Sequence, residues 1–258
     1  MKPRVSIVVP AYNEGAEIDI VLSRLGEAVT LPSEIVVVVD TPEDSTAPYV
    51  EKYGTRDERV RLVVNDIAPG PAQAIRYGIE QSVADVVVVT MADGCDDPQQ
   101  IDQLVRLVER GVVVAAASRY SRGGQQVGGP FLKSLLSRLA GLSLWALARV
   151  GTRDATNSFK AYDGDFIRQV GITSTAGFEI GIELVAKARR ARLPVAELPT
   201  IWLERHQGVS NFKLVSWLPH YLRWWRFAFG SRLTLDEIRV ATDEMATNVM
   251  ATDERGHQ

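Results

Sequence analysis

Cysteine and histidine are scarce in this chain, which has one cysteine, Cys95, and three histidines among 258 residues. A single cysteine excludes an internal disulfide and is typical of a protein in a reducing compartment. No histidine is close to Cys95 in the sequence, so we interpret Cys95 as a small loop residue rather than an activated nucleophile. His206 follows Arg205, and we interpret it as a binding or loop residue rather than a general base.

Long apolar runs are also missing. The longest charge-free apolar stretch in the middle of the chain, residues 139–148, has ten residues, whereas a membrane span needs about 20. Residues 1–10 pass directly into a strand-like run without the pattern of a signal peptide. We therefore expect a cytoplasmic protein that meets a membrane only from its surface.

Acidic residues are absent from two stretches of the chain. Residues 110–153 contain seven basic residues and residues 205–235 contain five, with no Asp or Glu in either stretch. The whole chain has 29 basic and 32 acidic residues, a formal charge of −3, which disfavours a general nucleic-acid binder. The two basic stretches predict local contact with an anionic ligand or an anionic surface.

Short β-branched runs alternate with helix-like segments through the first half of the chain. The runs are apolar on both faces, as in a parallel sheet that helices cover on both sides. The pattern predicts an α/β fold with a doubly wound, mostly parallel sheet, and ligands beyond the carboxyl ends of its strands. The predicted strands are 5–9, 35–39, 60–64, 86–89 and 112–116, and the predicted crossover helices are 17–29, 45–53, 71–82 and 98–110.

Polar and acidic residues follow these predicted strands. Glycine-rich phosphate-binding motifs are absent, because the first strand-to-helix turn reads Pro-Ala-Tyr-Asn-Glu-Gly. An edge lined with carboxylates suits a metal-bridged phosphate, or a base and ribose held by side chains. The residues concerned are Pro10 to Glu14 after the first strand, Asp40 and Asp44 after the second, Asp93, Asp96 and Asp97 after the fourth, and Arg119 and Tyr120 after the fifth.

Amphipathic helices dominate the second half of the chain. Residues 131–150 and 214–229 form basic, Trp-bearing helices of a kind that can lie in the interfacial plane of an anionic membrane. Each is also compatible with a core helix that has a solvated basic edge. Four of the five tryptophans fall within 202–225, which favours the interface. Residues 231–258 are expected to form a polar tail, loosely ordered from Asp243 onward.

Six short motifs occur in an order that resembles a known family. They are Val-Pro-Ala-Tyr-Asn-Glu at 9–14, Val-Asp-Thr-Pro-Glu-Asp-Ser-Thr at 39–46, Ala-Asp at 92–93 followed by Pro98, Ser-Arg-Tyr at 118–120, Asp-Ala-Thr-Asn-Ser-Phe-Lys-Ala-Tyr at 154–162, and Arg-x-x-Gly-x-Ser at 205–210 with Lys213. Over residues 4–230 the chain resembles the family 2 glycosyltransferases of GT-A fold. Within that family it is similar to the polyprenyl-phosphate sugar transferases typified by dolichyl-phosphate mannosyltransferase. The resemblance implies one GT-A domain over 1–230.

The resemblance implies a donor site for a nucleotide sugar. Residues matching the family's base and ribose contacts are Pro10, Ala11, Tyr12, Glu14 and Asp40, and those matching its diphosphate contacts are Ala92, Asp93, Arg119 and Lys213. Asp93, Arg119 and Arg205 are the expected catalytic residues. The expected acceptor-phosphate residues are Lys133, Arg138, Arg205 and Ser210.

A divalent metal, Mg²⁺ or Mn²⁺, is also implied, with Asp93 as the second acid of the family's Asp-x-Asp motif. Met91 replaces the first acid, and Val39 stands where another acid is usual. Hard cations prefer several oxygen ligands, so Asp96 is a candidate for the missing one. Asp97 is interpreted as the cap of the helix that begins near Pro98.

The resulting expectation is an inverting transferase that moves a sugar from GDP-mannose or a UDP-hexose to polyprenyl phosphate at the cytoplasmic membrane face. A phosphate acceptor is already anionic, so it needs a cationic clamp rather than a strong base. Transfer to a saccharide or other hydroxyl is the alternative, with Asp154 or Glu179 as base. A catalytically silent sugar-nucleotide-binding subunit is a third possibility, because Met91 removes a metal ligand.

Overall fold

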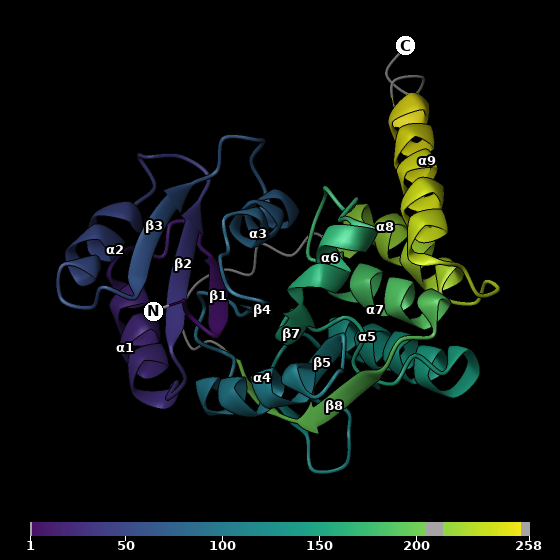
Figure 1. Ribbon diagram of the computed structural model, residues 1–258, viewed down its shortest axis with the longest axis horizontal. Helices are drawn as coiled ribbons and strands as arrows, with labels where there is room; N and C mark the ends of the chain where they lie inside the picture. Colours follow the sequence, from purple (N-terminus) through teal and green to yellow (C-terminus); the bar gives the residue numbers. More distant parts are fainter. Residues whose placement is uncertain (1, 205–213, 254–258) are drawn as a thin grey trace.

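The computed structural model describes residues 2–204 and 214–253. Its centre is a seven-stranded sheet in the order β3-β2-β1-β4-β7-β5-β8, with helices on both faces (Figure 1). The strands are β1 (Val5–Pro10), β2 (Ser33–Val39), β3 (Val60–Val64), β4 (Val86–Val89), β5 (Val114–Ser118), β7 (Lys160–Asp163) and β8 (Val195–Pro199).

The sheet is parallel except at β7, which pairs antiparallel with both β4 and β5. The predicted fold class, a mostly parallel sheet between helices, is therefore confirmed. β5 begins two residues later than the sequence suggested. The reason is local: the N–H of Val112 still donates to Leu107 O in the turn that ends the preceding helix.

Alternate residues of each central strand enter separate cores on the two faces of the sheet. Ile7 packs with Leu22 and Leu104 on one face, and Val8 packs with Ile75 and Val185 on the other. The first face carries α1 (Ile18–Ala28), α2 (Ala47–Gly54) and α4 (Ile101–Glu109). The second carries α3 (Pro71–Glu80), α6 (Gly164–Val170), α7 (Ile180–Ala191), α8 (Leu214–Phe227) and α9 (Leu235–Asp253). Short helices η1 (Gly15–Glu17) and η2 (Pro98–Gln100) precede α1 and α4.

The expectation of a loosely ordered tail from Asp243 onward is wrong for its described part, because the 19-residue helix α9 extends to Asp253. Ile238 and Thr242 are fully buried, and α9 contacts α6 and α7 before it leads away from the body (Figure 1). Its start is a reciprocal cap: Thr234 Oγ1 accepts from Glu237 N, and Glu237 Oε2 accepts from Thr234 N. Thr-x-x-Glu before an apolar position is a helix-start pattern that the polar composition obscured.

The second half of the chain also builds a helix with an unusual distribution of apolar side chains. α5 (Phe131–Ser143) continues into a π-helical turn, η3 (Leu144–Ala148), and both follow β6 (Gln125–Val127), which pairs with β9 (Ile201–Leu203). Leu132, Leu139 and Leu147 are between 56 and 71% exposed. By length and composition alone, Phe131–Ala148 meets the criteria for a membrane span, with a mean hydropathy of 1.3 and 17% of the segment buried.

Candidate active site

The loops after β1 and β2 are fastened to each other at the carboxyl edge of the sheet. Asn13 has a left-handed φ of 55°, and its N–H donates to the Asp44 carboxylate at 3.0 Å. Glu14 N donates to Thr46 Oγ1 at 3.0 Å. Tyr12 stays 59% exposed, so its ring lies at the surface of this edge. The structure thus fastens the loop that holds Tyr12 and Glu14 to the loop that follows Asp40.

Asp40 is held in place by the next strand of the sheet. Its Oδ1 accepts from Asn65 Nδ2 at 3.1 Å, and its Oδ2 accepts from Gly70 N at 2.8 Å. Asn65, only 6% exposed, also donates to Ala68 O. Sequence reasoning missed Asn65. The available signal was its position directly after the third predicted strand, at the same edge as the acids.

Asp93 and Asp96 lie in the loop that follows β4. Asp93 Oδ1 accepts from Cys95 N at 3.0 Å, and Cys95 is a buried loop residue. Gly94 turns the loop with φ 68°, and its carbonyl accepts from Arg24 at 2.7 Å. Asp97 accepts from Gln99 N at the start of η2, which confirms its interpretation as a cap.

Asp96 is a buried carboxyl group with local partners. Its Oδ2 accepts from Thr90 Oγ1 at 3.0 Å and from Met91 N at 3.2 Å. Burial, and then the nearby charge of Asp93, raise the pKa of Asp96 to about 7. Asp96 is thus easily protonated, whereas Asp93 is only half-buried.

These carboxylates fit a magnesium-type site only if other molecules complete it. Among the described residues, no group of three or more His, Cys, Asp and Glu side chains is placed to hold a metal. Mg²⁺ is commonly bound by one or two carboxylates, with water and substrate phosphates filling the other positions. Asp93 with Asp96 beside it meets that limited requirement.

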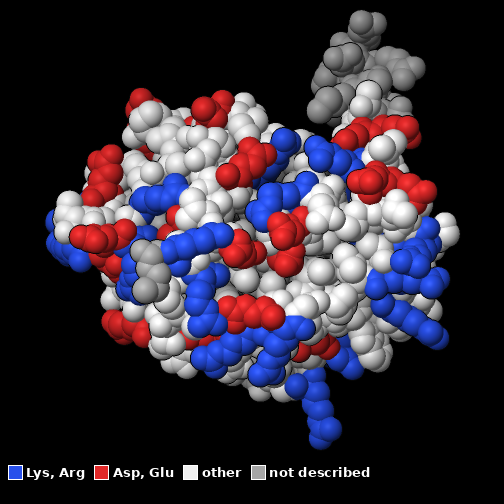
Figure 2. Space-filling view, in the orientation of Figure 1, with Lys and Arg blue, Asp and Glu red and all other residues white. Residues whose placement is uncertain are grey.

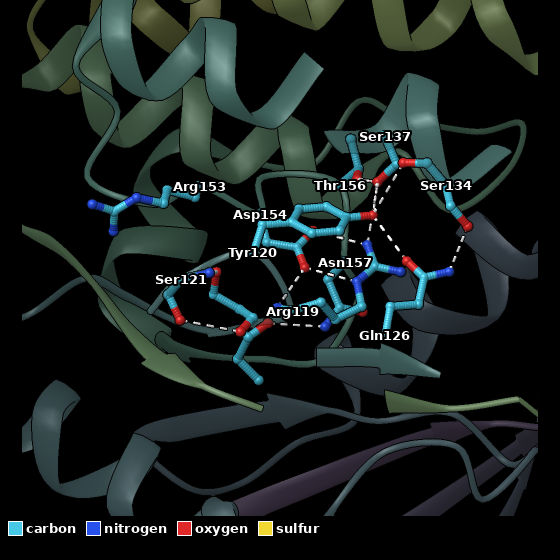
Figure 3. Close-up of polar contacts among 12 residues, drawn as sticks. Arg119, Tyr120, Ser121, Gln126, Ser134, Ser137, Arg153, Asp154, Thr156 and Asn157 are labelled. Carbon is cyan, nitrogen blue, oxygen red and sulfur yellow. Dashed lines mark hydrogen bonds and ion pairs between the residues drawn. The ribbon is translucent and has the colours of Figure 1, made fainter. Parts of the chain in front are cut away.

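Arg119 and Asp154 form a buried ion pair directly beyond β5 (Figure 3). Asp154 accepts from Arg119 Nε at 2.7 Å, from Nη2 at 2.8 Å and from the backbone N–H at 3.0 Å. Burial alone would raise the pKa of Asp154, but Arg119 holds it below its usual value. Arg119 likewise favours the charged form of Asp96, so its positive charge acts on the Asp93 loop.

Hydroxyl groups tie α5 to this ion pair. Ser137 Oγ accepts from Arg119 Nη2 at 3.3 Å, and it lies within hydrogen-bond distance of the Tyr120 hydroxyl, at 3.1 Å, and of Thr156 Oγ1, at 2.6 Å. Tyr120 also donates to Gln126, whose amide nitrogen donates to Ser134 at 2.6 Å (Figure 3). Sequence reasoning missed this network, because serines inside an apolar helix carry no distinctive signal.

Lys133 lies in the first turn of α5. It is a predicted acceptor-phosphate residue whose pKa is affected by the charge of Asp93. Burial, and then the charge of Arg119, lower the pKa of Lys133, whereas Asp93 and Glu204 act in the opposite direction. Glu204 is fixed next to α5 because it accepts from Gly129 N at 2.7 Å. Arg138 is exposed, with its guanidinium carbon 6.0 Å from the centre of the Tyr120 ring.

The two carboxylates considered as bases are both occupied. Asp154 is fully buried against Arg119. Glu179, also fully buried, accepts from Ala176 N at 3.1 Å and Gly177 N at 2.7 Å. Lys160 lies behind Asp154, where burial lowers its pKa to about 7 against the opposite effect of that carboxylate. Neither Asp154 nor Glu179 is placed to take a proton from an incoming hydroxyl group.

Four residues named from the sequence, Arg205, His206, Ser210 and Lys213, lie outside the described residues. Ala92 is buried beside Asp93, while Pro10 and Ala11 end β1 and begin its loop. The structure therefore gathers Asp93, Asp96, Arg119 and Lys133 into one electrostatically coupled group. The donor residues of β1 and β2 lie along the same sheet edge.

Residues 6–171 match the family model described as glycosyl transferase family 2. The chain belongs to glycosyl transferase family 2. This family 2 glycosyltransferase is 28% identical over 214 residues to undecaprenyl-phosphate mannosyltransferase of Micrococcus luteus, covering 81% of this chain and 87% of that protein. It is 26% identical over 230 residues to polyprenol monophosphomannose synthase of Mycolicibacterium smegmatis, covering 83% and 86% of the two chains.

The fold of the glycosyltransferase is similar to that of a solved enzyme. Glucosyl-3-phosphoglycerate synthase from Mycobacterium tuberculosis, in complex with Mn²⁺, UDP-glucose and phosphoglyceric acid, gives a TM-score of 0.68 over 90% of this chain and 81% of that chain. The two sequences are 17% identical. The likeness shows the shared GT-A fold, as the resemblance implied.

Proposed function

We propose that this glycosyltransferase is an inverting enzyme that moves one sugar from GDP-mannose or a UDP-hexose to polyprenyl phosphate at the cytoplasmic face of a membrane. The observation that carries the proposal is the position of Lys133, which is electrostatically linked to Asp93 while its neighbours Phe131 and Leu132 are 80% and 58% exposed. An acceptor phosphate bound at Lys133 has apolar protein surface beside it for its prenyl chain. The names of the two relatives, an undecaprenyl-phosphate mannosyltransferase and a polyprenol monophosphomannose synthase, support this acceptor class.

The donor lies along the carboxyl edge of β1, β2 and β4 in this proposal. Tyr12, Glu14 and Asp40 orient the base and ribose, with Asp40 fixed by Asn65 and Gly70. Asp93, with Asp96 behind it, holds a divalent metal on the diphosphate. When bound, such a metal neutralises negative charge on the departing nucleoside diphosphate.

Arg119 and Lys133 supply further positive charge on the two sides of the anomeric carbon. Stabilising charge that develops on the diphosphate lowers the barrier, because fixed charges in a partly buried site need little reorganisation. Asp154 keeps the Arg119 guanidinium in one orientation through two side-chain hydrogen bonds. Attack from the acceptor side then inverts the anomeric configuration.

The acceptor phosphate is anionic near neutral pH, so it requires no general base. Lys133 and Arg138 are proposed to bind its oxygens. Arg205 and Ser210, which the family resemblance assigns to the acceptor phosphate, are proposed to join them. The hydrogen bonds already made by Asp154 and Glu179 disfavour transfer to a neutral hydroxyl group through either carboxylate.

The membrane contact is assigned to α5. Its leucines face outward, whereas Ser134, Ser137 and Gly141 face the body. A Cβ at Gly141 would collide with the backbone carbonyl of Arg153, so the inner face of the helix must be small. This arrangement inverts the usual pattern, in which a helix turns its apolar face to the core. It is the arrangement expected where the outer medium is lipid.

The decisive test is transfer of radiolabelled sugar to polyprenyl phosphate in detergent by wild-type protein and Asp93→Asn. We expect the variant to lose at least about 100-fold in kcat, as for removal of one charge-stabilising group. Its thermal stability should be unchanged, because the Asn carbonyl can still accept from Cys95 N. Asp97→Asn is the matched control, since Asn remains a good cap. Full activity of Asp93→Asn excludes the proposed metal site, and inactive wild-type protein that binds donor supports a silent subunit.

The acceptor assignment is tested by replacing Lys133 and Arg138 together with Gln. Because hydrogen bonds to charged groups contribute about 1.5–3 kcal/mol, we expect the acceptor KM to rise about 10-fold or more. Donor binding, measured by calorimetry, should change much less. Lys52→Gln with Arg106→Gln, both exposed on remote helices, controls for net charge. Equal losses of donor and acceptor binding would contradict a lipid-phosphate clamp.

A further inference from the structure

The far end of α5 has a backbone that differs from the rest of the helix. Leu144–Ala148 is a π-helical turn, and Arg149 ends it with a left-handed φ of 58°. Left-handed backbone is uncommon at a residue other than glycine, and π turns often occur at functional positions. Gly151 follows with φ 86°, where a Cβ would collide with Val195. The chain therefore reverses sharply at a helix end that stays at the surface.

This reversal leaves a hollow of about 470 Å³ at the surface. Trp145, Ala146, Arg149 and Gly151 line it. Trp145 is 40% exposed, and Leu147, next to the lining residue Ala146, is 71% exposed. The hollow thus opens beside the outward apolar stripe of α5. It thus combines the aromatic side chain of Trp145 and the cationic side chain of Arg149, with the exposed Leu147 nearby.

The charge of the hollow is positive. Arg149 is exposed and takes part in none of the ion pairs found among the described residues. Glu197 lies near this region but is already paired with Arg153, whose guanidinium carbon lies 4.1 Å from the Trp145 ring centre. In Figure 2, basic side chains gather on the right of the molecule, on the side where α7 ends in Figure 1.

This position is distinct from the acceptor-phosphate site. Arg149 follows Lys133 by 16 positions, which corresponds to about 24 Å along a helix. One phosphate cannot contact both residues. A ligand at Arg149 is therefore a second anion, at the same side of α5 as the apolar stripe.

We propose that the hollow at Trp145 and Arg149 binds the phosphate headgroup of an anionic bilayer lipid. Tryptophan and arginine beside exposed leucine match the layered chemistry of a membrane surface, where apolar chains give way to interfacial aromatic rings and then to phosphate. The inference rests on the proposed membrane-bound function, and it adds an anchoring site separate from the transfer chemistry. The lipid at this site fixes the far end of α5, so the Lys133 end is held against the bilayer.

The test is partitioning of the full-length protein onto sedimented vesicles of phosphatidylcholine, alone or in an equimolar mixture with phosphatidylglycerol. Arg149→Asn removes the charge while keeping a residue that tolerates left-handed backbone. We expect its partition coefficient on the mixed vesicles to fall about fivefold, the effect of one basic residue near an anionic surface. Binding to phosphatidylcholine alone should be the same for both proteins.

Arg106→Asn is the charge-matched control, because Arg106 is exposed on α4, on the opposite face of the sheet. It should bind mixed vesicles as wild type does. If Arg149→Asn also binds as wild type does, or if the wild type does not prefer mixed vesicles, the proposal is overturned.

Transfer to polyprenyl phosphate in detergent separates this proposal from the proposed function. Arg149→Asn should keep wild-type activity there, with an unchanged circular dichroism spectrum. A loss of activity in detergent would place Arg149 in the transfer site and overturn the headgroup assignment. Inactive wild-type protein that still prefers anionic vesicles through Arg149 would instead refute the proposed function and support the anchoring site.

Discussion

The helices α5 and α8 have similar compositions and opposite environments. Both are basic and contain several leucines, α8 and the η3 extension of α5 carry tryptophan, and both segments fit an interfacial helix by sequence. In the structure α8 buries Trp224 and Phe227, whereas α5 exposes most of its leucines. What separates them is the neighbouring face: α8 meets the apolar surface of α7, and α5 meets hydroxyl groups around Arg119. Amino-acid composition therefore predicts that a segment forms an amphipathic helix, but the surface against which the helix packs determines which of its faces is buried.

The largest expected difference between the two helices is in stability. Trp224 is fully buried, and its ring N–H donates to Ser174 at 2.9 Å. Trp224→Ala should lower the free energy of unfolding by about 3–5 kcal/mol, as for other large buried aromatic side chains. Trp145→Ala on η3 should cost only about 1 kcal/mol. Urea unfolding of both variants measures the two losses in the free energy of unfolding. Equal losses would contradict the proposed difference between α8 and α5.

A second difference between the two helices is the buried carboxylate that supports each, Glu183 for α8 and Asp154 for α5. Glu183 and Lys187 form a fully buried ion pair at 2.7 Å beneath α8. Burial would raise the pKa of Glu183, but Lys187 holds it below 4.5, its ordinary value. A carboxylate with a lowered pKa stabilises the fold above pH 4.5 and loses that contribution as pH falls through its folded pKa. Hydrogen exchange should therefore show α8 losing protection as the solution is acidified through the folded pKa of Glu183.

Glu183→Gln should be less stable than wild type at neutral pH, because it leaves Lys187 buried without its carboxylate. Its stability should then fall less steeply below pH 4.5. The Ser137 contacts of α5 lead through Arg119 to Asp154, a carboxylate that Glu183→Gln leaves in place, so the acid response of α5 should not change in this variant. An acid profile that is unchanged in this variant would assign the effect to another group.

The smallest expected effect on stability is at the outward face of α5. Leu132 and Leu139 are 58% and 56% exposed, so replacing both with Ser should change the free energy of unfolding by no more than about 0.5 kcal/mol per site. The same double variant should bind lipid vesicles more weakly, because less apolar surface enters the bilayer. Unchanged vesicle binding would place the membrane contact elsewhere.

The regular part of the fold could be predicted from the sequence. The first four predicted strands are present, because runs such as Val86–Val89 are apolar on both faces and only a covered parallel sheet accommodates them. The acids after those strands lie at one edge for the same reason. The side on which α5 turns its leucines could not be predicted, since it depends on Tyr120 and Ser137 meeting across distant segments.

Asp154 shows a second limit. We expected ligand-binding residues to follow strands, but Asp154 precedes β7. β7 runs against β4 and β5, so the end at which the chain enters β7 lies at the edge where the chain leaves its neighbours. The rule that ligand-binding residues follow the strands of a parallel sheet therefore identifies Arg119, but it does not identify Asp154, which precedes an antiparallel strand.

The antiparallel pairing of β5 with β7 makes the whole stretch between them a single elaborated hairpin. That hairpin carries β6, α5 and η3. The Arg119–Asp154 ion pair joins its two ends, because Arg119 directly follows β5 and Asp154 precedes β7. The proposed donor residues of β1, β2 and β4 lie outside this stretch. In the proposed function this stretch carries the acceptor and membrane contacts, so replacing it should alter both and leave the proposed nucleotide-sugar residues of β1, β2 and β4 in place.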